Sequence, residues 1–152
     1  MSPEPEPVLV FQEFEVVSGF VEPGPERLSD VLNSIEALSV RATTEDGSPG
    51  DPAEMPVDDI LLLAPPPRET DPGRRVARSR RRVALHVGPY HVVGTAHLPP
   101  GTEIEAFIAE KPQRFMALTD CRVLIREVEY TPEVTIVNVA RVIEVEHLIT
   151  VA

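Results

Sequence analysis

The sequence has no tryptophan, a single cysteine and few aromatic residues. Phe and Tyr make up 5% of its 152 residues, so a hydrophobic core must be built mainly from Val, Ile and Leu. Because Cys121 is the only cysteine, no disulfide can form within the chain. The longest apolar run, residues 60–64, is far too short to span a bilayer, and the first residues lack the basic start and apolar core of a secretory signal. We therefore expect a cytoplasmic protein.

Motifs that carry chemistry are also missing. The sequence has no Gly-x-Gly-x-x-Gly, no Walker-type loop and no Gly-x-Ser-x-Gly, which argues against a phosphate cradle and a hydrolase nucleophile. A tight hairpin would place His86 opposite His91, but two ligands do not make a zinc site, and His97 lies roughly 20 Å further along its strand. Cys121 sits in an apolar segment and is interpreted as a core residue. We expect no enzymatic activity, no metal ion and no other cofactor.

Charge is distributed unevenly along the chain, whose net charge is −11. Residues 1–67 carry 2 Arg against 14 Asp and Glu, and residues 83–152 carry 5 basic against 9 acidic groups. Residues 68–82 carry 7 Arg against 2 acidic groups. This pattern indicates two acidic bodies joined by an Arg-rich connector.

Two parts of the chain resemble each other at one constant offset, which places residue 8 on residue 84. The segment VLVFQEFEVVSGFVEPGPERLSDVLN (8–33) aligns without gaps with ALHVGPYHVVGTAHLPPGTEIEAFIA (84–109), and most of the apolar positions agree. Further on, VDDILLL (57–63) and VARVIEV (139–145) look like matching closing strands. Self-similarity at a fixed shift indicates an internal repeat.

The second copy indicates the order strand, strand, helix and three more strands. Residues 83–87 alternate between apolar and other positions, Gly-Pro at 88–89 makes a turn, and residues 90–98 return. The spacing of Thr102 and Glu105 matches a capping box at a helix start. Three segments rich in β-branched residues follow, and five short strands suit a small barrel. We predict a first module at 8–64 with a mobile loop at 43–54, a Pro- and Arg-rich linker at 65–82, and a second module at 83–150.

The segment RLSDVLN (27–33) has two interpretations. Its apolar residues recur at i, i+3 and i+4, so they share one helix face that would pack against the sheet or plug a barrel end. The polar residues Arg27, Asp30 and Asn33 would then lie at the wet edges of a packing helix. Alternatively, these three side chains form a surface that binds a partner.

The segment RRVARSRRR (74–82) is the strongest charge feature of the chain. Clustered Arg displaces counterions from phosphates, which would attach the chain to nucleic acid or to an anionic membrane surface. The acidic flanks would repel a polyanion and few aromatics exist for base stacking, so a strap across the chain's own acidic modules, or across a partner's acidic face, is the alternative. The candidate partner-binding residues are therefore Arg27, Asp30, Asn33, Arg74, Arg75, Arg78, Arg80, Arg81 and Arg82.

Several of these segments together resemble a small bacterial domain family of unknown function, with the pattern G-x-h-x-L-P-P-G-x-R-L-S-D-x-L-N, then L-T-D-A, then V-N-x-x-x-I. The segments that carry the resemblance are RLSDVLN (27–33), YHVVGTAHLPPG (90–101), FMALTDCRV (115–123) and VNVARVIEVE (137–146). The first copy keeps RLSDVLN and the second keeps HLPPG; in the second copy Glu103, Glu105, Ala106 and Ala109 replace the polar residues of the pattern. The resemblance implies a fold more than an activity, and the strand order is similar to Sm-like and SH3-like barrels.

The chain is therefore expected to be mainly β, with two tandem small Sm/SH3-like β-barrel modules that each carry one short helix. The expected function is that of a non-enzymatic cytoplasmic protein-interaction or scaffold module. Its partner would be another protein or a second copy of the chain, since exposed barrel edges favour strand-to-strand pairing. The alternative is a nucleic-acid-associated regulator that binds through residues 74–82.

Overall fold

The computed structural model describes residues 4–24, 27–66, 79–110 and 113–147. In the first half of the chain the elements are β1 (Glu6–Phe11), β2 (Val16–Val21), α1 (Leu28–Ser34), β3 (Ala37–Thr43), β4 (Pro49–Pro56), the 3-10 turn η1 (Val57–Asp59) and β5 (Leu62–Ala64). In the second half they are β6 (Ser79–Val87), β7 (Tyr90–Leu98), α2 (Ile104–Glu110), β8 (Phe115–Ile125), β9 (Val128–Tyr130), β10 (Val134–Asn138), the 3-10 turn η3 (Val139–Arg141) and β11 (Val142–His147).

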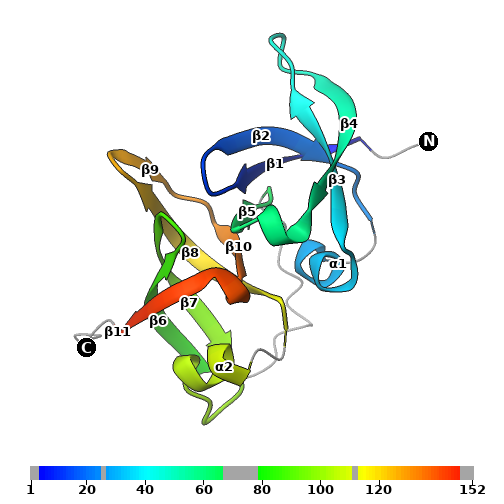
Figure 1. Ribbon diagram of the computed structural model, residues 1–152. Coiled ribbons are helices and arrows are strands. Elements are labelled where there is room, and N and C mark those ends of the chain that lie inside the picture. Colours follow the sequence, from blue (N-terminus) through cyan, green and yellow to red (C-terminus); the bar gives the residue numbers. More distant parts are fainter. Residues whose placement is uncertain (1–3, 25–26, 67–78, 111–112, 148–152) are drawn as a thin grey trace.

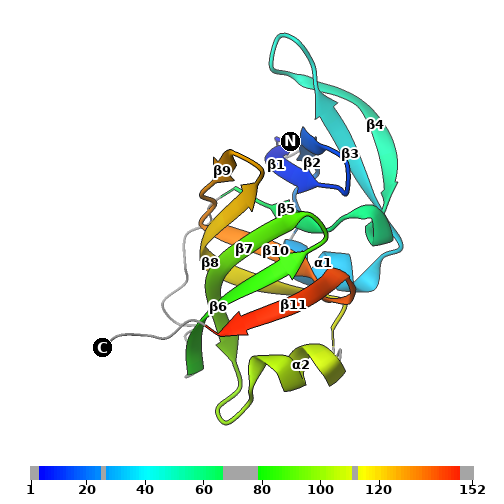
Figure 2. The same ribbon diagram turned by 60° about the vertical axis from the view of Figure 1, so that its left-hand side comes forward.

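The strands form one antiparallel sheet that runs through both halves of the chain (Figure 1). Their order is β11-β6-β7-β8-β10-β5-β1-β2-β3-β4, and β9 pairs with β8 beside this path. The mainly β class is therefore confirmed. In the described part of the chain the sheet does not close, because β11 and β4 each pair with one neighbour and lie at opposite ends of the molecule (Figure 2). The sheet of the described residues is therefore open, and the tandem Sm/SH3-like barrel modules stay a prediction.

The two halves share one order of elements, apart from β9, which has no counterpart in the first half. Helices α1 and α2 have the same length, and their first residues, Leu28 and Ile104, are partners in the alignment of the two sequence copies. In each half a 3-10 turn precedes a strand that pairs with the first strand of that half, β5 with β1 and β11 with β6. The strand after each helix pairs with the strand before the 3-10 turn, β3 with β4 and β8 with β10. This correspondence is what an internal repeat predicts, and the duplication itself stays a prediction.

Residues 43–54, which we expected to be a loop, mostly form a strand. Strands β3 and β4 pair from Ala37 opposite Pro56 to Thr43 opposite Pro49, and only residues 44–48 make the turn. The Pro- and Gly-rich composition of this segment suggests a loop, but β4 is an edge strand. Proline is tolerated there because its missing N–H would face away from the sheet. The resulting hairpin projects from the rest of the molecule in both views (Figure 2).

Strand β6 begins at Ser79, ahead of the predicted start at Val83, so residues 79–82 belong to the sheet and not to the linker. They pair with residues 95–98 of β7. The reason lies in β7, which has nine residues. Without the extension of β6, backbone groups at the end of β7 would lose their hydrogen-bond partners on this side.

The joint between the halves is a continuous part of the sheet. Strand β5 lies between β1 of its own half and β10 of the other half. Each of the two hydrophobic clusters takes residues from both halves: Phe11 and Leu61 pack into the core of the second half, and Phe115 and Ile136 into that of the first. Because neither core is complete without the other half, we expect the halves to unfold together.

Buried polar groups also brace this joint. The amide of Asn138 donates from Nδ2 to the carbonyl of Ile60 at 2.9 Å, and its Oδ1 accepts from the N–H of Ala140 at 3.2 Å. The Asn138 backbone N–H donates to the carbonyl of Leu61 at 2.9 Å. The hydroxyl of Tyr90 donates to the carbonyl of Gln12 in the turn after β1. The joint is therefore fixed by directed bonds as well as by apolar packing.

Candidate functional site

The segment RLSDVLN forms the start and body of α1, as its apolar spacing predicts. Leu32 is fully buried in the core of the first half. Asn33 points to the second half, where Nδ2 donates to the carbonyl of Phe115 at 3.2 Å and Oδ1 accepts from the Phe115 N–H at 2.8 Å. The Asn33 amide therefore joins the two halves and is not presented to a partner. Arg27 and Asp30 are exposed, and their contact with a partner stays a prediction.

The described arginines of the Arg-rich segment have different surroundings. Arg82 donates to the hydroxyl of Thr95 at 3.1 Å and to the carbonyl of Asp120 at 2.6 Å. Arg81 lines a surface hollow together with Glu103, which directly precedes α2, and Glu105 of α2. Arg80 is exposed. One arginine is thus engaged within the fold and a second lies beside carboxylates of its own chain, which disfavours a polyanion at this position.

Arg74, Arg75 and Arg78 lie outside the described residues. Their assignment to a partner surface therefore stays a prediction.

The two edge strands carry features that oppose pairing with another strand. Pro52 of β4 pairs with Arg41, and Ile136 of β10 pairs with Ala117. Arg41 and Ala117 correspond to each other in the two copies, because the offset of the repeat separates them. Pro52 thus occupies on β4 the place of Ile136, which pairs with β5 at the joint. Because proline lacks the N–H, β4 cannot repeat that joint with another chain. Strand β11 carries a register shift after Val142 and two glutamates, which also discourage edge pairing.

The open side of the first half forms a groove of about 290 Å³. It lies between the turn that follows β1 and the β3–β4 hairpin, where the curved sheet does not close. Its floor is apolar and its rim is acidic, and none of the described residues that line it is Lys, Arg or His. The floor includes Val17, Val40 and Met55, and the rim includes Glu15, Asp51, Glu54 and Asp59.

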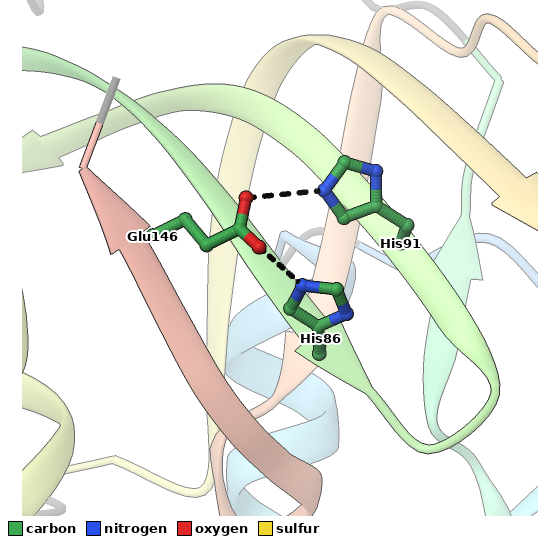
Figure 3. Close-up of side chains that lie close together, drawn as sticks. All are labelled: His86, His91 and Glu146. Atoms are coloured by element: carbon green, nitrogen blue, oxygen red, sulfur yellow. Dashed lines mark hydrogen bonds and ion pairs between the residues drawn. The ribbon is translucent and has the colours of Figure 1, made fainter. Parts of the chain in front are cut away.

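Three side chains from neighbouring strands converge on the outer face of the second half (Figure 3). His86 of β6 and His91 of β7 lie directly opposite each other, as the hairpin predicts, with ring centroids 4.8 Å apart. Glu146 of β11 reaches both rings: Oε1 lies 2.8 Å from Nε2 of His86, and Oε2 lies 3.8 Å from Nε2 of His91. The hydrogen bond with His86 lowers the pKa of the Glu146 carboxyl.

This cluster was only half predictable. His86 and His91 are close in sequence, but the contact with Glu146 depends on the register of β11 against β6. No spacing rule reveals that register, because 60 residues separate His86 from Glu146. His97, the next histidine on β7, is not part of the cluster, and its Nε2 lies 2.7 Å from the hydroxyl of Thr119.

Cys121 lies in the core of the second half, as interpreted from its apolar surroundings. Burial raises the pKa of its thiol, so the reactive thiolate is disfavoured. Its burial therefore argues against a role as a nucleophile.

Within the described part of the chain, α1 and α2 each have seven residues, and neither is long or apolar enough to cross a membrane. Against known proteins, the chain matches no family model, no curated protein sequence and no solved structure.

Proposed function

We propose that the protein is a non-enzymatic interaction module that holds a basic segment of a partner protein in the groove of its first half. The observation that carries this proposal is the combination of an apolar floor with four carboxylates on the rim. Such a groove suits arginine, whose aliphatic stem covers apolar surface while its guanidinium binds carboxylates in a bidentate manner. The negative charge of residues 1–67 would also draw a basic segment towards it.

The dimensions of the groove favour a peptide side chain over a small-molecule substrate. A volume of about 290 Å³ is just below the range of roughly 300–1,000 Å³ for ligand pockets. The four carboxylates belong to exposed residues, and a single exposed ion pair contributes at most about 1 kcal/mol. Affinity must therefore come from several ion pairs together with burial of the apolar floor, and it should fall with salt.

We infer that the halves are tandem copies of one Sm/SH3-like module, which the shared order of elements and the matched starts of α1 and α2 support.

A free thiol at Cys121 suits the reducing cytoplasm, where we place this role. Nucleic-acid binding through residues 74–82 is the competing hypothesis, and the carboxylates beside Arg81 weigh against it.

The experiment uses a fluorescent peptide with the sequence RRVARSRRR and measures its anisotropy as protein is added. The chain should bind it saturably, and the double substitution Asp51→Asn with Glu54→Gln should weaken binding by at least about tenfold, the effect of about 1.4 kcal/mol. The matched control is Glu127→Gln with Glu133→Gln, which removes two exposed carboxylates from the second half.

Equal weakening by the groove and control variants would mean that only net charge matters, and the groove proposal would be wrong. Absence of saturable binding would have the same meaning. A labelled single-stranded oligonucleotide that binds more tightly than the peptide, and loses affinity on Arg80→Ser with Arg81→Ser, would establish the competing hypothesis instead.

A further inference from the structure

We propose that His86, His91 and Glu146 form a binding site for a divalent transition-metal ion, with Zn²⁺ as the best match. The site lies on the outer face of β11, β6 and β7, in the other half of the chain from the groove (Figure 3). It does not depend on the function proposed above. Imidazole and carboxylate groups are ordinary ligands of Zn²⁺, and a set of two histidines and one glutamate leaves a fourth position for water.

The donor atoms lie near the separations that such an ion needs. Two ligands placed about 2.1 Å from a tetrahedral ion are roughly 3.4 Å apart. The distances from the Glu146 carboxylate to the two Nε2 atoms, 2.8 Å for His86 and 3.8 Å for His91, lie on either side of this value. One donor atom from each residue can be chosen so that all lie within 4.8 Å of one another. Small side-chain rotations would therefore bring the three groups into coordinating positions.

The backbone holds the three residues in place. His86 and His91 are register partners in the β6–β7 hairpin, and Glu146 pairs with Ala84, on the same strand as His86. Ligands carried by paired strands keep their spacing better than ligands carried by loops. The side chains of His86, His91 and Glu146 are 35%, 34% and 45% exposed, so an ion and a water ligand can reach them from solvent.

An ion pair alone explains the arrangement less well. The Glu146 carboxylate makes a hydrogen bond of 2.8 Å with His86. Its other oxygen faces Nε2 of His91 at 3.8 Å, which is too long for a hydrogen bond. The second imidazole therefore approaches the carboxylate only at ion-pair distance, and a cation between the three groups would give both imidazoles a close partner.

Metal binding would have a structural consequence for β11. This strand is at the edge of the sheet and pairs only with β6 among the described strands. An ion held by Glu146 and His91 would connect β11 to β7 as well. Binding should therefore stabilise the native chain, because an unfolded chain does not hold the three ligands together.

The test is a calorimetric titration of the metal-free full-length chain with ZnCl₂. We expect one ion per chain, and a rise in the unfolding midpoint when Zn²⁺ is in excess. His86→Gln, His91→Gln and Glu146→Gln should each weaken binding by more than about tenfold, the loss that follows removal of even an outer-shell partner. His97→Gln is the matched control, since His97 lies on β7 and its Nε2 lies beside Thr119; it should leave the affinity unchanged.

Titration with CoCl₂ provides a second readout that does not depend on variant folding. Four-coordinate Co²⁺ bound by these ligands should give visible absorption that saturates at one ion per chain and disappears when Zn²⁺ is added. The proposal is wrong if the wild-type chain shows no saturable binding of either ion, or if His97→Gln weakens binding as much as His86→Gln does.

Discussion

The substitution Asn138→Ala tests the joint between the halves directly. It removes two side-chain hydrogen bonds, from Nδ2 to the carbonyl of Ile60 and from the N–H of Ala140 to Oδ1. Ala140 is exposed, so water can replace the lost acceptor. Ile60 is fully buried, so water does not replace the donor that its carbonyl loses. An unsatisfied buried group costs about 1–3 kcal/mol. With about 1 kcal/mol for the net loss of a bond, we expect the free energy of unfolding to fall by about 2–4 kcal/mol.

The matched comparison is Asn33→Ala, which removes the two bonds that the Asn33 amide makes with the backbone of Phe115. Asn33 is only half-buried and both of its bonds are partly buried, whereas the bond from Asn138 to Ile60 is buried. We expect a smaller loss, about 1–2 kcal/mol, because an unsatisfied group costs less where it is less buried. We therefore predict that Asn138→Ala lowers the free energy of unfolding more than Asn33→Ala does, although each substitution removes two hydrogen bonds.

Urea unfolding followed by far-ultraviolet circular dichroism measures both losses. The midpoint should move while the slope m stays constant, because neither substitution changes the surface that unfolding exposes. In thermal unfolding, each kcal/mol should lower Tm by about 2–4 °C for a chain of this size. A loss below about 0.5 kcal/mol for Asn138→Ala would refute the reasoning. Two separate transitions in the wild-type chain would also refute it, since the halves would then fold independently.

Three further predictions concern Asp46, Cys121 and Pro52. An NMR titration should give Asp46 a pKa of about 2, lowered from 3.8 by hydrogen bonds from Ser48 and Thr44. Stability from this carboxylate is then fully present above pH 3.8 and is lost as the pH falls towards 2, and Ser48→Ala should raise the pKa. The buried Cys121 thiol should react with a disulfide reagent only as fast as the chain opens, so rapid reaction in native buffer would contradict its placement. Pro52→Val restores an outward N–H on β4 and should increase self-association in analytical ultracentrifugation, whereas Ala53→Val should not; equal behaviour would show that Pro52 does not protect this edge.

Features set by local pattern were predictable from the sequence. The apolar spacing of RLSDVLN matches helix α1, and the Gly-Pro turn at 88–89 fixes the pairing of His86 with His91. The constant offset between the two sequence copies matches the starts of both helices. In the first two cases the signal lies within a few neighbouring residues, where propensity and periodicity act, and in the third it lies in the repeated pattern.

Features that depend on the edge of the sheet, or on pairing between segments far apart in the sequence, were not predictable. Strand β4 has the composition of a loop, and its prolines are compatible with a strand only because that strand has no outer neighbour among the described residues. The amides of Asn33 and Asn138 bond to backbone groups of Phe115 and Ile60, in the opposite half of the chain. The third member of the histidine cluster, Glu146, depends likewise on the pairing of β11 with β6. None of these partners has a local sequence signal, because tertiary pairing alone brings them together.

The position of β5 has a consequence for synthesis on the ribosome. Leu63 of β5 can pair with Ile136 of β10 only after Ile136 has been translated, which happens much later. At about 5–20 residues per second, this interval lasts roughly 4–15 s. During that time the nascent first half presents Phe11 and Leu61 without the second-half core that covers them. The interval of translation between β5 and β10 is therefore when the nascent chain is most exposed to aggregation and has most need of a chaperone.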